Sequence, residues 1–234
     1  MPALPAPERV TVPIIGFGGV GETDEQTRRL YEYVVAASGA ERPRVCFVPT
    51  AVGDQTEGIA RFLERWEGLG DLSVAKFFPW PRPDLREHLL GQDVVVVSGG
   101  NTANMLAIWR LHGFDALLRE AWERGVVLAG GSAGMICWFE ASLTDSYGPQ
   151  LDGMRDGLGF LAGSACPHYD GEELRRPRYR ELVDGGFPAG VAAEDGVALR
   201  YEGTELAEVV TCRPGAQAYR VEPGSETPLG ARPI

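Results

Sequence analysis

The chain has 234 residues, of which 33 are acidic and 22 basic, and its formal net charge at pH 7 is −11. This length is enough for one α/β domain or two small ones and for a substantial buried core. The acidic balance and the lack of a Lys/Arg run argue against a nucleic-acid-binding surface. No stretch approaches the roughly 20 apolar residues that span a bilayer. We therefore expect a small molecule or peptide as partner, without nucleic acid or membrane, and a homodimer is compatible with the composition.

The amino-terminal segment and the cysteines both indicate a cytoplasmic protein. The segment "MPALPAPERV" has neither the basic start nor the apolar core of a signal peptide. The cysteines have no C-x-x-C spacing and sit mostly in apolar runs, which is typical of reduced thiols rather than of disulfides or a zinc site. They are Cys46, Cys137, Cys166 and Cys212. We expect no metal and no organic cofactor.

Strand-like apolar runs alternate with segments of helical periodicity along most of the chain. Fully apolar strands in such a series predict a mainly parallel sheet with helices on both faces. After about residue 185, shorter pieces separated by Gly and Pro favour antiparallel strands or a hairpin. No linker or repeat interrupts the pattern, so residues 1–234 are interpreted as a single domain. Strands are expected at 10–19, 43–51, 72–80, 93–100 and 125–131, and helices at 24–37, around 55–67, around 102–123 and from Ala133.

Glycine-rich loops follow three of these strands, at 16–21, 99–100 and 130–134. The carboxyl ends of parallel strands are where such sheets place their sites. The first loop, "GFGGVG", fits the dinucleotide pattern G-x-G-x-x-G. However, acidic residues crowd the helix start, where a phosphate needs positive potential; they are Glu22, Asp24 and Glu25. We interpret this loop as a tight turn that borders a site.

The third loop, "GGSAG", has the G-x-S-x-G form of a nucleophile elbow, with a strand before it and a helix after it. Flanking glycines allow the sharp turn and leave room for a substrate carbonyl to reach Ser132. The backbone N–H of Ala133 would then point toward a developing oxyanion. The alternative is a glycine-rich turn in which Ser132 only caps the helix.

A serine nucleophile needs a base, and the chain has three histidines. His88 and His112 lie in helical surroundings with charged neighbours. His168 instead follows an apolar run and Pro167, an arrangement that places it at the end of a strand. A hydrogen-bonded loop histidine is the alternative.

The segment "SGGNTANML" (98–106) follows the most apolar strand. Its glycine N–H groups, at Gly99 and Gly100, could serve an oxyanion together with Ala133. Asn101 and Thr102 open the next helix, where they are candidate substrate contacts. Helix capping by either residue explains the same pattern without a function, and the two interpretations are compatible.

Three segments, "SGGNTANML", "GGSAGMICWFE" and "CPHYDGEELRRPRYREL", resemble in order and spacing the peptidase E group of the S51 serine peptidases. That group includes aspartyl dipeptidases and, more remotely, cyanophycinase, and the resemblance covers nearly the whole chain. It implies a flavodoxin-like parallel sheet, with Ser132 as nucleophile and His168 as base. It also implies that the N–H groups of Gly100 and Ala133 form the oxyanion hole.

The third triad member departs from the family pattern. Aspartyl dipeptidases carry an acidic residue there, usually glutamate, just before a glycine in a late strand. The matching "AAEDGVAL" offers Glu194 and Asp195. Adjacent strand residues point to opposite faces, so only one can face His168, and alignment on Gly196 selects Asp195. Weaker candidates are Asp145 and Asp170.

Substrate preference depends on a different set of residues. Aspartyl dipeptidases need a cation for the acidic side chain, and Arg175 and Arg176, with Arg178 nearby, could form a fork for a carboxylate. A solvated helix face is the alternative for these arginines. We expect a serine peptidase-like hydrolase of small peptides, with Asp-X dipeptides among its substrates. The other hypotheses are an esterase or amidase with the same triad and a catalytically silent binding protein of the same fold.

Overall fold

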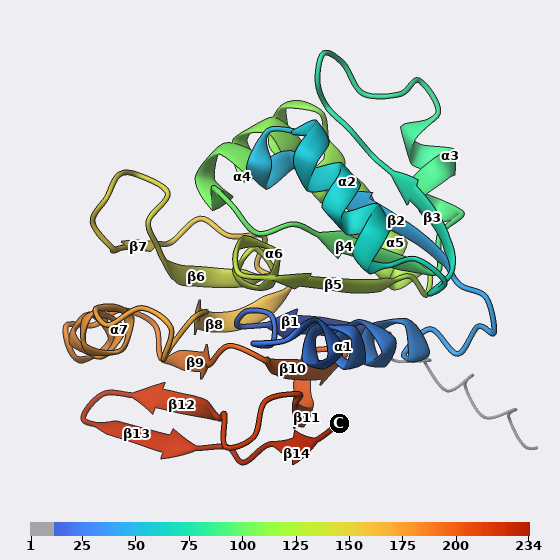
Figure 1. Cartoon of the computed structure of the whole chain (residues 1–234). Coiled ribbons are helices and arrows are strands. Elements are labelled where there is room, and N and C mark those ends of the chain that lie inside the picture. The colour runs from blue at the N-terminus through green and yellow to red at the C-terminus, as the bar shows by residue number, and fades with distance from the viewer. Residues whose placement is uncertain (1–11) are drawn as a thin grey trace, which may run out of the picture.

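The structure, a computed structural model, describes residues 12–234 and contains two sheets (Figure 1). In spatial order, the eight-stranded sheet consists of β14 (Arg232–Pro233), β11 (Glu205–Thr211), β10 (Val197–Glu202), β1 (Pro13–Phe17), β5 (Val127–Gly131), β4 (Val94–Val97), β2 (Arg44–Val48) and β3 (Asp71–Val74). The six-stranded sheet consists of β13 (Ser225–Pro228), β12 (Ala218–Glu222), β9 (Gly190–Ala193), β8 (Leu161–Cys166), β6 (Phe139–Thr144) and β7 (Asp152–Met154).

The centre of the larger sheet is parallel, as predicted. Strands β1, β5, β4, β2 and β3 pair in parallel, whereas β10 and β11 add antiparallel strands beyond β1. The run β3-β2-β4-β5 follows the flavodoxin-like order, with β1 next to β5. The predicted α/β fold class is confirmed, including antiparallel strands in the last part of the chain.

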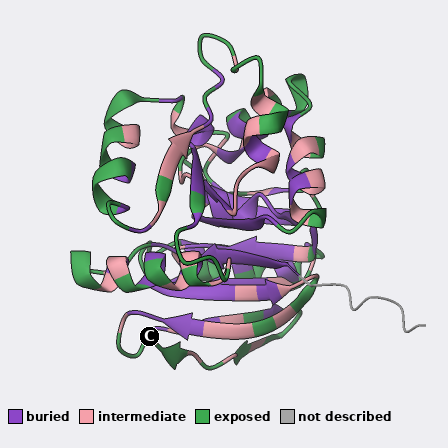
Figure 2. Ribbon diagram, turned by 90° about the vertical axis from the view of Figure 1, so that its right-hand side faces the viewer, coloured by how far each residue is buried: buried purple, intermediate pink, exposed green. Residues whose placement is uncertain are grey.

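Helices cover both faces of the larger sheet because consecutive strand residues face opposite sides. On one face, Ile15 and Val96 pack with residues of α1 and α2; on the other, Ile14 and Val95 pack with residues of α4 and α5. The central strands β1, β4 and β5 are buried, and the helices turn exposed surfaces outward (Figure 2). The helices are α1 (Asp24–Ala36), α2 (Thr56–Arg65), α3 (Leu85–Leu90), α4 (Thr102–Leu111), α5 (Phe114–Glu123), α6 (Ala133–Ile136) and α7 (Arg175–Asp184), and the 3-10 turn η1 is Thr50–Val52.

Several element boundaries differ from the sequence-based expectation. The helix expected around 102–123 is two helices, because Gly113 adopts a left-handed conformation (φ 67°) between α4 and α5. The strand expected at 72–80 ends at Val74, and the N–H groups of Phe77 and Phe78 donate to the Asp54 carboxylate instead of to a strand. The helix from Ala133 has only four residues. Residues 10–11 of the first expected strand lie outside the described residues.

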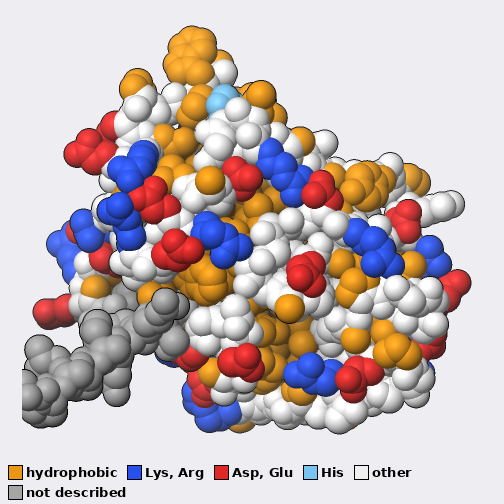
Figure 3. Space-filling model, turned by 180° about the vertical axis from the view of Figure 1, so that it is seen from behind, with side chains coloured by type: hydrophobic (Ala, Val, Ile, Leu, Met, Phe, Trp, Pro, Cys, Tyr) orange, Lys and Arg blue, Asp and Glu red, His pale blue; other side chains and the backbone are white. Residues whose placement is uncertain are grey.

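The second sheet was not anticipated as a separate sheet, whereas α3 and α7 agree with the helical surroundings expected for His88 and with the helix face considered for Arg175 and Arg176. Strands β6 (FEASLT) and β8 (LAGSAC) of that sheet each contain serine among other small or polar residues, so their sequences lack the fully apolar character of β4 (VVVV). Acidic and basic side chains are interspersed over the face shown in Figure 3. Within residues 12–234, no helix combines the length and the apolar character needed to cross a bilayer.

The close approach of α6 to β4 gives a stability prediction. A Cβ at Gly134 would lie 2.3 Å from the carbonyl oxygen of Val97, so Gly134→Ala should force the two elements apart and lower the free energy of unfolding by about 1–3 kcal/mol. Gly58→Ala in α2 is the matched control, because its Cβ would meet only Val52 Cγ2, at an ordinary contact distance of 3.4 Å. This change should raise the free energy of unfolding by roughly 0.5–1 kcal/mol. Denaturant unfolding of both variants measures the difference. Equal stabilities would contradict the packing argument.

Candidate active site

Ser132 lies on a strained turn between β5 and α6. Its φ of 54° and ψ of −116° are unusual for a residue with a side chain. The turn is held by a hydrogen bond from its N–H to the carbonyl of Phe17 (3.1 Å) and by tight packing, since a Cβ at Gly131 would lie 2.3 Å from the Phe17 ring. Its side chain makes no capping hydrogen bond to α6. The helix-cap interpretation of Ser132 is therefore wrong.

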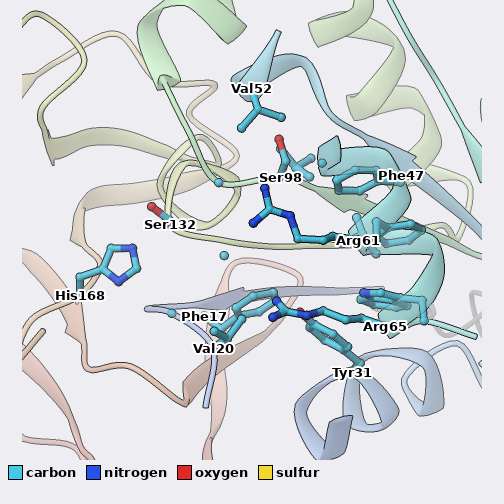
Figure 4. A pocket seen from close by; sticks show the side chains of 18 residues that line it. Phe17, Val20, Tyr31, Phe47, Val52, Arg61, Arg65, Ser98, Ser132 and His168 are labelled. Carbon is cyan, nitrogen blue, oxygen red and sulfur yellow. The ribbon is translucent and has the colours of Figure 1, made fainter. Parts of the chain in front are cut away.

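His168 and Asp195 form a close pair. The distance from His168 Nδ1 to Asp195 Oδ1 is 2.6 Å, and both side chains are partly exposed. When Nδ1 donates its proton to Asp195, Nε2 is the acceptor nitrogen of the neutral ring. Ser132 and His168 line the same pocket, and the imidazole faces the side on which Ser132 lies (Figure 4).

Glu194, the neighbour of Asp195, points away from His168. Its carboxylate accepts hydrogen bonds from the N–H of Gln217 (2.8 Å) and the hydroxyl of Tyr219 (3.0 Å), and it is buried. The two acidic neighbours therefore have opposite orientations, as expected, although they lie between β9 and β10 rather than within a strand. Asp145 lies elsewhere, at 4.0 Å from Arg175.

Asp170 and Arg213 hold the backbone of Asp195. The carboxylate of Asp170 accepts a hydrogen bond from the Asp195 N–H (3.0 Å), and the Nε of Arg213 donates to the Asp195 carbonyl (3.0 Å). Arg213 also forms an ion pair with Asp170 and lies 3.8 Å from Glu194. These contacts fix the main chain from which the Asp195 carboxylate reaches His168.

Three consecutive carbonyl groups at the end of β1 and just after it hold the segments that carry Ser132, His168 and Asp195. Each accepts a hydrogen bond from the backbone of a different segment, so one short stretch fixes their relative positions. The bonds run from Ser132 N to Phe17 O (3.1 Å), from His168 N to Gly18 O (3.3 Å) and from Gly196 N to Gly19 O (3.0 Å).

The same stretch explains the "GFGGVG" motif. A Cβ at Gly18 would lie 2.3 Å from the carbonyl oxygen of Ala193, and one at Gly19 would lie 1.9 Å from Asp195 Oδ1. Glycine is required at both positions because the backbone passes so close to its neighbours. The structure thus agrees with a tight turn bordering the site. Gly18 packs against the backbone of Ala193, and Gly19 packs against the side chain of Asp195.

The loop 98–101 runs alongside Ser132. A Cβ at Gly99 would lie 3.3 Å from Ser132 Cβ, and Gly100 has a φ of 130° with no space for a Cβ beside the carbonyl of Ala51. Among residues 12–234, nothing accepts a hydrogen bond from the N–H of Gly100 or of Ala133. Both N–H groups are therefore available to an oxygen atom of a ligand.

Asn101 and Thr102 take part in local structure. The side chain of Asn101 accepts from the N–H of Asn104 as the cap of α4 and donates to the carbonyl of Ser146 (2.9 Å). Thr102 is buried, and its N–H donates to the hydroxyl of Ser146 (2.9 Å). Neither residue lines the pocket that contains Ser132.

Arg175 and Arg176 also lie away from that pocket. Arg175 is buried and pairs with Glu172 (2.7 Å). Arg176 forms an ion pair with Glu226 and stacks its guanidinium on the ring of Tyr219, 4.8 Å from the centroid. The two arginines expected to bind a substrate carboxylate are therefore paired with carboxylates of the protein itself, and they do not line the pocket of Ser132.

The pocket itself, of about 310 Å³, contains two arginines that the sequence reasoning missed. Arg61 and Arg65 come from α2, one helical turn apart, and line the pocket together with Ser132 and His168. The signal in the sequence was the i, i+4 spacing of two basic residues on a helix that begins near η1. In the part of the chain that the structure describes, no group of three or more His, Cys, Asp or Glu residues could hold a metal ion.

Comparison with known proteins gives the family. The model of peptidase family S51 matches residues 14–209. The chain belongs to this family. The uncharacterized peptidase YgaJ of Bacillus subtilis (strain 168) is 47% identical over 211 residues, which cover 89% of this chain and 91% of that protein.

Two solved structures share the fold of this S51 member. A peptidase from an acI-B1 actinobacterium has a TM-score of 0.69 at 18% identity, covering 95% of this chain and 96% of that one. A Listeria monocytogenes EGD-e protein assigned to peptidase E has a TM-score of 0.61 at 18% identity, covering 86% and 98%. The resemblance to S51 peptidases is confirmed, and family membership supports peptidase activity.

The cysteines provide a test of which side chain acts as nucleophile. All four are buried, and burial raises the pKa of Cys46 to about 12 and that of the other three thiols above its ordinary value. Raised pKa values leave little thiolate at pH 8. We therefore expect iodoacetamide to modify almost no cysteine of the native protein at this pH, as measured by intact mass, and to leave peptidase activity intact. The urea-unfolded chain is the control and should take up four labels; rapid labelling of the native protein would contradict the burial.

Proposed function

We propose that this S51 family member is a serine peptidase that hydrolyses small peptides. The observation that carries the proposal is the hydrogen bond between His168 Nδ1 and Asp195 (2.6 Å), made by a ring that faces Ser132 on its elbow. A carboxylate on one nitrogen of an imidazole and a hydroxyl on the other side is the arrangement of a Ser-His-Asp triad.

In the proposed mechanism, Ser132 Oγ attacks the carbonyl carbon of the scissile peptide bond. Nε2 of His168 takes the hydroxyl proton as the new C–O bond forms and then gives it to the leaving amine. Asp195 keeps the proton on Nδ1 and stabilises the imidazolium that forms. Water then attacks the acyl-enzyme by the same route, with His168 again as base, and releases the second product.

Two backbone N–H groups support this mechanism. The N–H groups of Gly100 and Ala133 lack acceptors among the described residues and belong to the two segments that flank Ser132. We assign them to the negative oxygen of the tetrahedral intermediate, which needs donors that are already in position. A side chain at Gly99 would crowd an entering carbonyl group, because its Cβ would lie 3.8 Å from Ser132 Oγ.

The pocket supports small substrates. A volume of about 310 Å³ accommodates one or two amino-acid residues beside Ser132. Specificity for Asp-X dipeptides stays a prediction, and it receives no support from Arg175 or Arg176, whose guanidinium groups are paired elsewhere. An esterase or amidase would use the same three residues. A silent binding protein would not need the strained conformation of Ser132.

Replacement of the nucleophile should separate catalysis from stability. We expect Ser132→Ala to lower turnover of any peptide substrate by several orders of magnitude, because His168 then has no hydroxyl to activate. The melting temperature should change by no more than a few degrees, since backbone bonds and glycine packing hold the turn. Peptide hydrolysis followed by mass spectrometry and thermal unfolding provide the two measurements. Wild-type turnover by the alanine variant would disprove the role of Ser132.

The two acidic neighbours should differ in their effects. Asp195→Asn favours the wrong imidazole tautomer and should lower kcat by about 10⁴-fold, the size of the loss known for this change in a serine protease triad. Glu194→Gln keeps an acceptor for Gln217 and Tyr219 and should affect stability more than kcat. Steady-state kinetics with one dipeptide substrate compare the variants. A larger kcat loss for Glu194→Gln would show that Asp195 is not the third triad member.

A further inference from the structure

The pocket beside Ser132 has aromatic walls. Phe47 stacks on Phe62 (ring centroids 4.1 Å apart), Phe62 on Trp66 (5.0 Å) and Trp66 on Tyr31 (4.5 Å), and all four line the pocket with Phe17. These rings come from β1, α1, β2 and α2, so the walls are part of the protein core and have fixed positions. Such a surface favours an apolar body of a ligand.

Two cations stand at the border of this pocket. Arg61 and Arg65 are exposed residues of α2, and their guanidinium groups extend across the pocket toward the end where Ser132 and His168 lie (Figure 4). Within residues 12–234, Arg61 has no acidic partner within 4.0 Å, and the ion pair of Arg65 with Asp24 is at the 4.0 Å limit. In a protein with a net charge of −11, two weakly paired arginines at the mouth of an apolar pocket favour an anion.

A second, more polar hollow of about 450 Å³ continues outward from the first. It shares Tyr31, Arg61 and Arg65 with the inner pocket and adds Asp24, Glu64 and Arg28, whose guanidinium is already paired with Glu32 (3.1 Å). The carboxylates of Asp24 and Glu64 line only this outer hollow, where they offset the positive charge of the arginines. A negatively charged group is therefore best accommodated on the inner side of the two arginines, next to the aromatic walls.

We propose that this pocket binds the carboxylate-bearing residue of a short peptide, with its apolar part against the aromatic walls and its carboxylate on Arg61 and Arg65. The inference rests on the proposed function for the peptide character of the ligand. An arginine guanidinium matches a carboxylate with two parallel N–H donors. Two sources offer this chemistry, the C-terminal carboxylate of an apolar residue and the side chain of an acidic residue.

Binding to the Ser132→Ala variant tests the inference without hydrolysis. The probes are N-acetylphenylalanine, which has an α-carboxylate beside an aromatic ring, N-acetylphenylalanine amide, which has only the ring, and N-acetylglutamate α-amide, which has only a side-chain carboxylate. Isothermal titration calorimetry gives Kd for each probe. We expect at least one of the two acids to bind about 10-fold or more tightly than N-acetylphenylalanine amide, and the acid that binds identifies the source of the carboxylate.

The variant Arg61→Met in the same background keeps an apolar stem and removes the charge. It should weaken binding of the acid by about 10-fold and leave binding of the amide unchanged. Arg86→Met is the matched control, because Arg86 pairs with Glu120 on α5 and does not line the pocket; it should leave both affinities unchanged. Added salt should weaken binding of the acid only.

Failure of this inference is distinguishable from failure of the proposed function. Equal affinities for acid and amide, no binding of any probe, or unchanged binding after Arg61→Met would overturn the inference, and peptide hydrolysis by the wild-type protein would then still support the proposed function. Binding of an acid that depends on Arg61, in a protein that hydrolyses no peptide, would support the pocket assignment and overturn the catalytic role.

Discussion

The geometry of the site depends on the backbone of residues 17–19. Three successive carbonyl oxygens hold the segments of Ser132, His168 and Asp195 by hydrogen bonds of 3.0–3.3 Å. The carbonyl of Phe17, the last residue of β1, holds the segment after β5, and the next two carbonyls, of Gly18 and Gly19, hold the segments after β8 and β9. The two sheets therefore meet at the site. Position 19 has to be glycine, because the backbone there passes so close to Asp195 that a Cβ would lie 1.9 Å from its Oδ1.

The proposed chemistry and the proposed ligand recognition belong to different parts of the molecule. The residues assigned to catalysis and the N–H groups assigned to the oxyanion lie on loops at the ends of β4, β5, β8 and β9, whereas the aromatic and basic side chains of the pocket come mostly from α1 and α2. The two parts share only the pocket's inner end. A substitution on α2 can therefore change which ligand is bound without moving the imidazole or the carboxylate behind it.

The sequence allowed prediction of local features with strong physical signals. Apolar runs identified the parallel strands, and the G-x-S-x-G pattern located the turn at Ser132, since few residue types fit such a backbone. Alignment of the family pattern on Gly196 selected Asp195 over Glu194. Partner choice could not be predicted: Arg175 and Arg176 are paired with Glu172 and Glu226, and Glu226 is 50 residues away in the chain. The i, i+4 spacing of Arg61 and Arg65 puts both on one face of α2, but it does not indicate which segment that face lies beside.

The order of the paired segments along the chain affects when the proposed triad can assemble during protein synthesis. Strand β1 is synthesised well before its antiparallel partner β10 (Val197–Glu202) and before Asp195, the hydrogen-bond partner of His168. Until Asp195 has left the ribosome, the imidazole lacks this partner, and the turn at 18–19 lacks the segment that packs against it. A nascent chain that ends before residue 195 therefore contains Ser132 and His168 without the carboxylate of the proposed triad. The topology thus delays assembly of the proposed triad until the segment between β9 and β10 has been made.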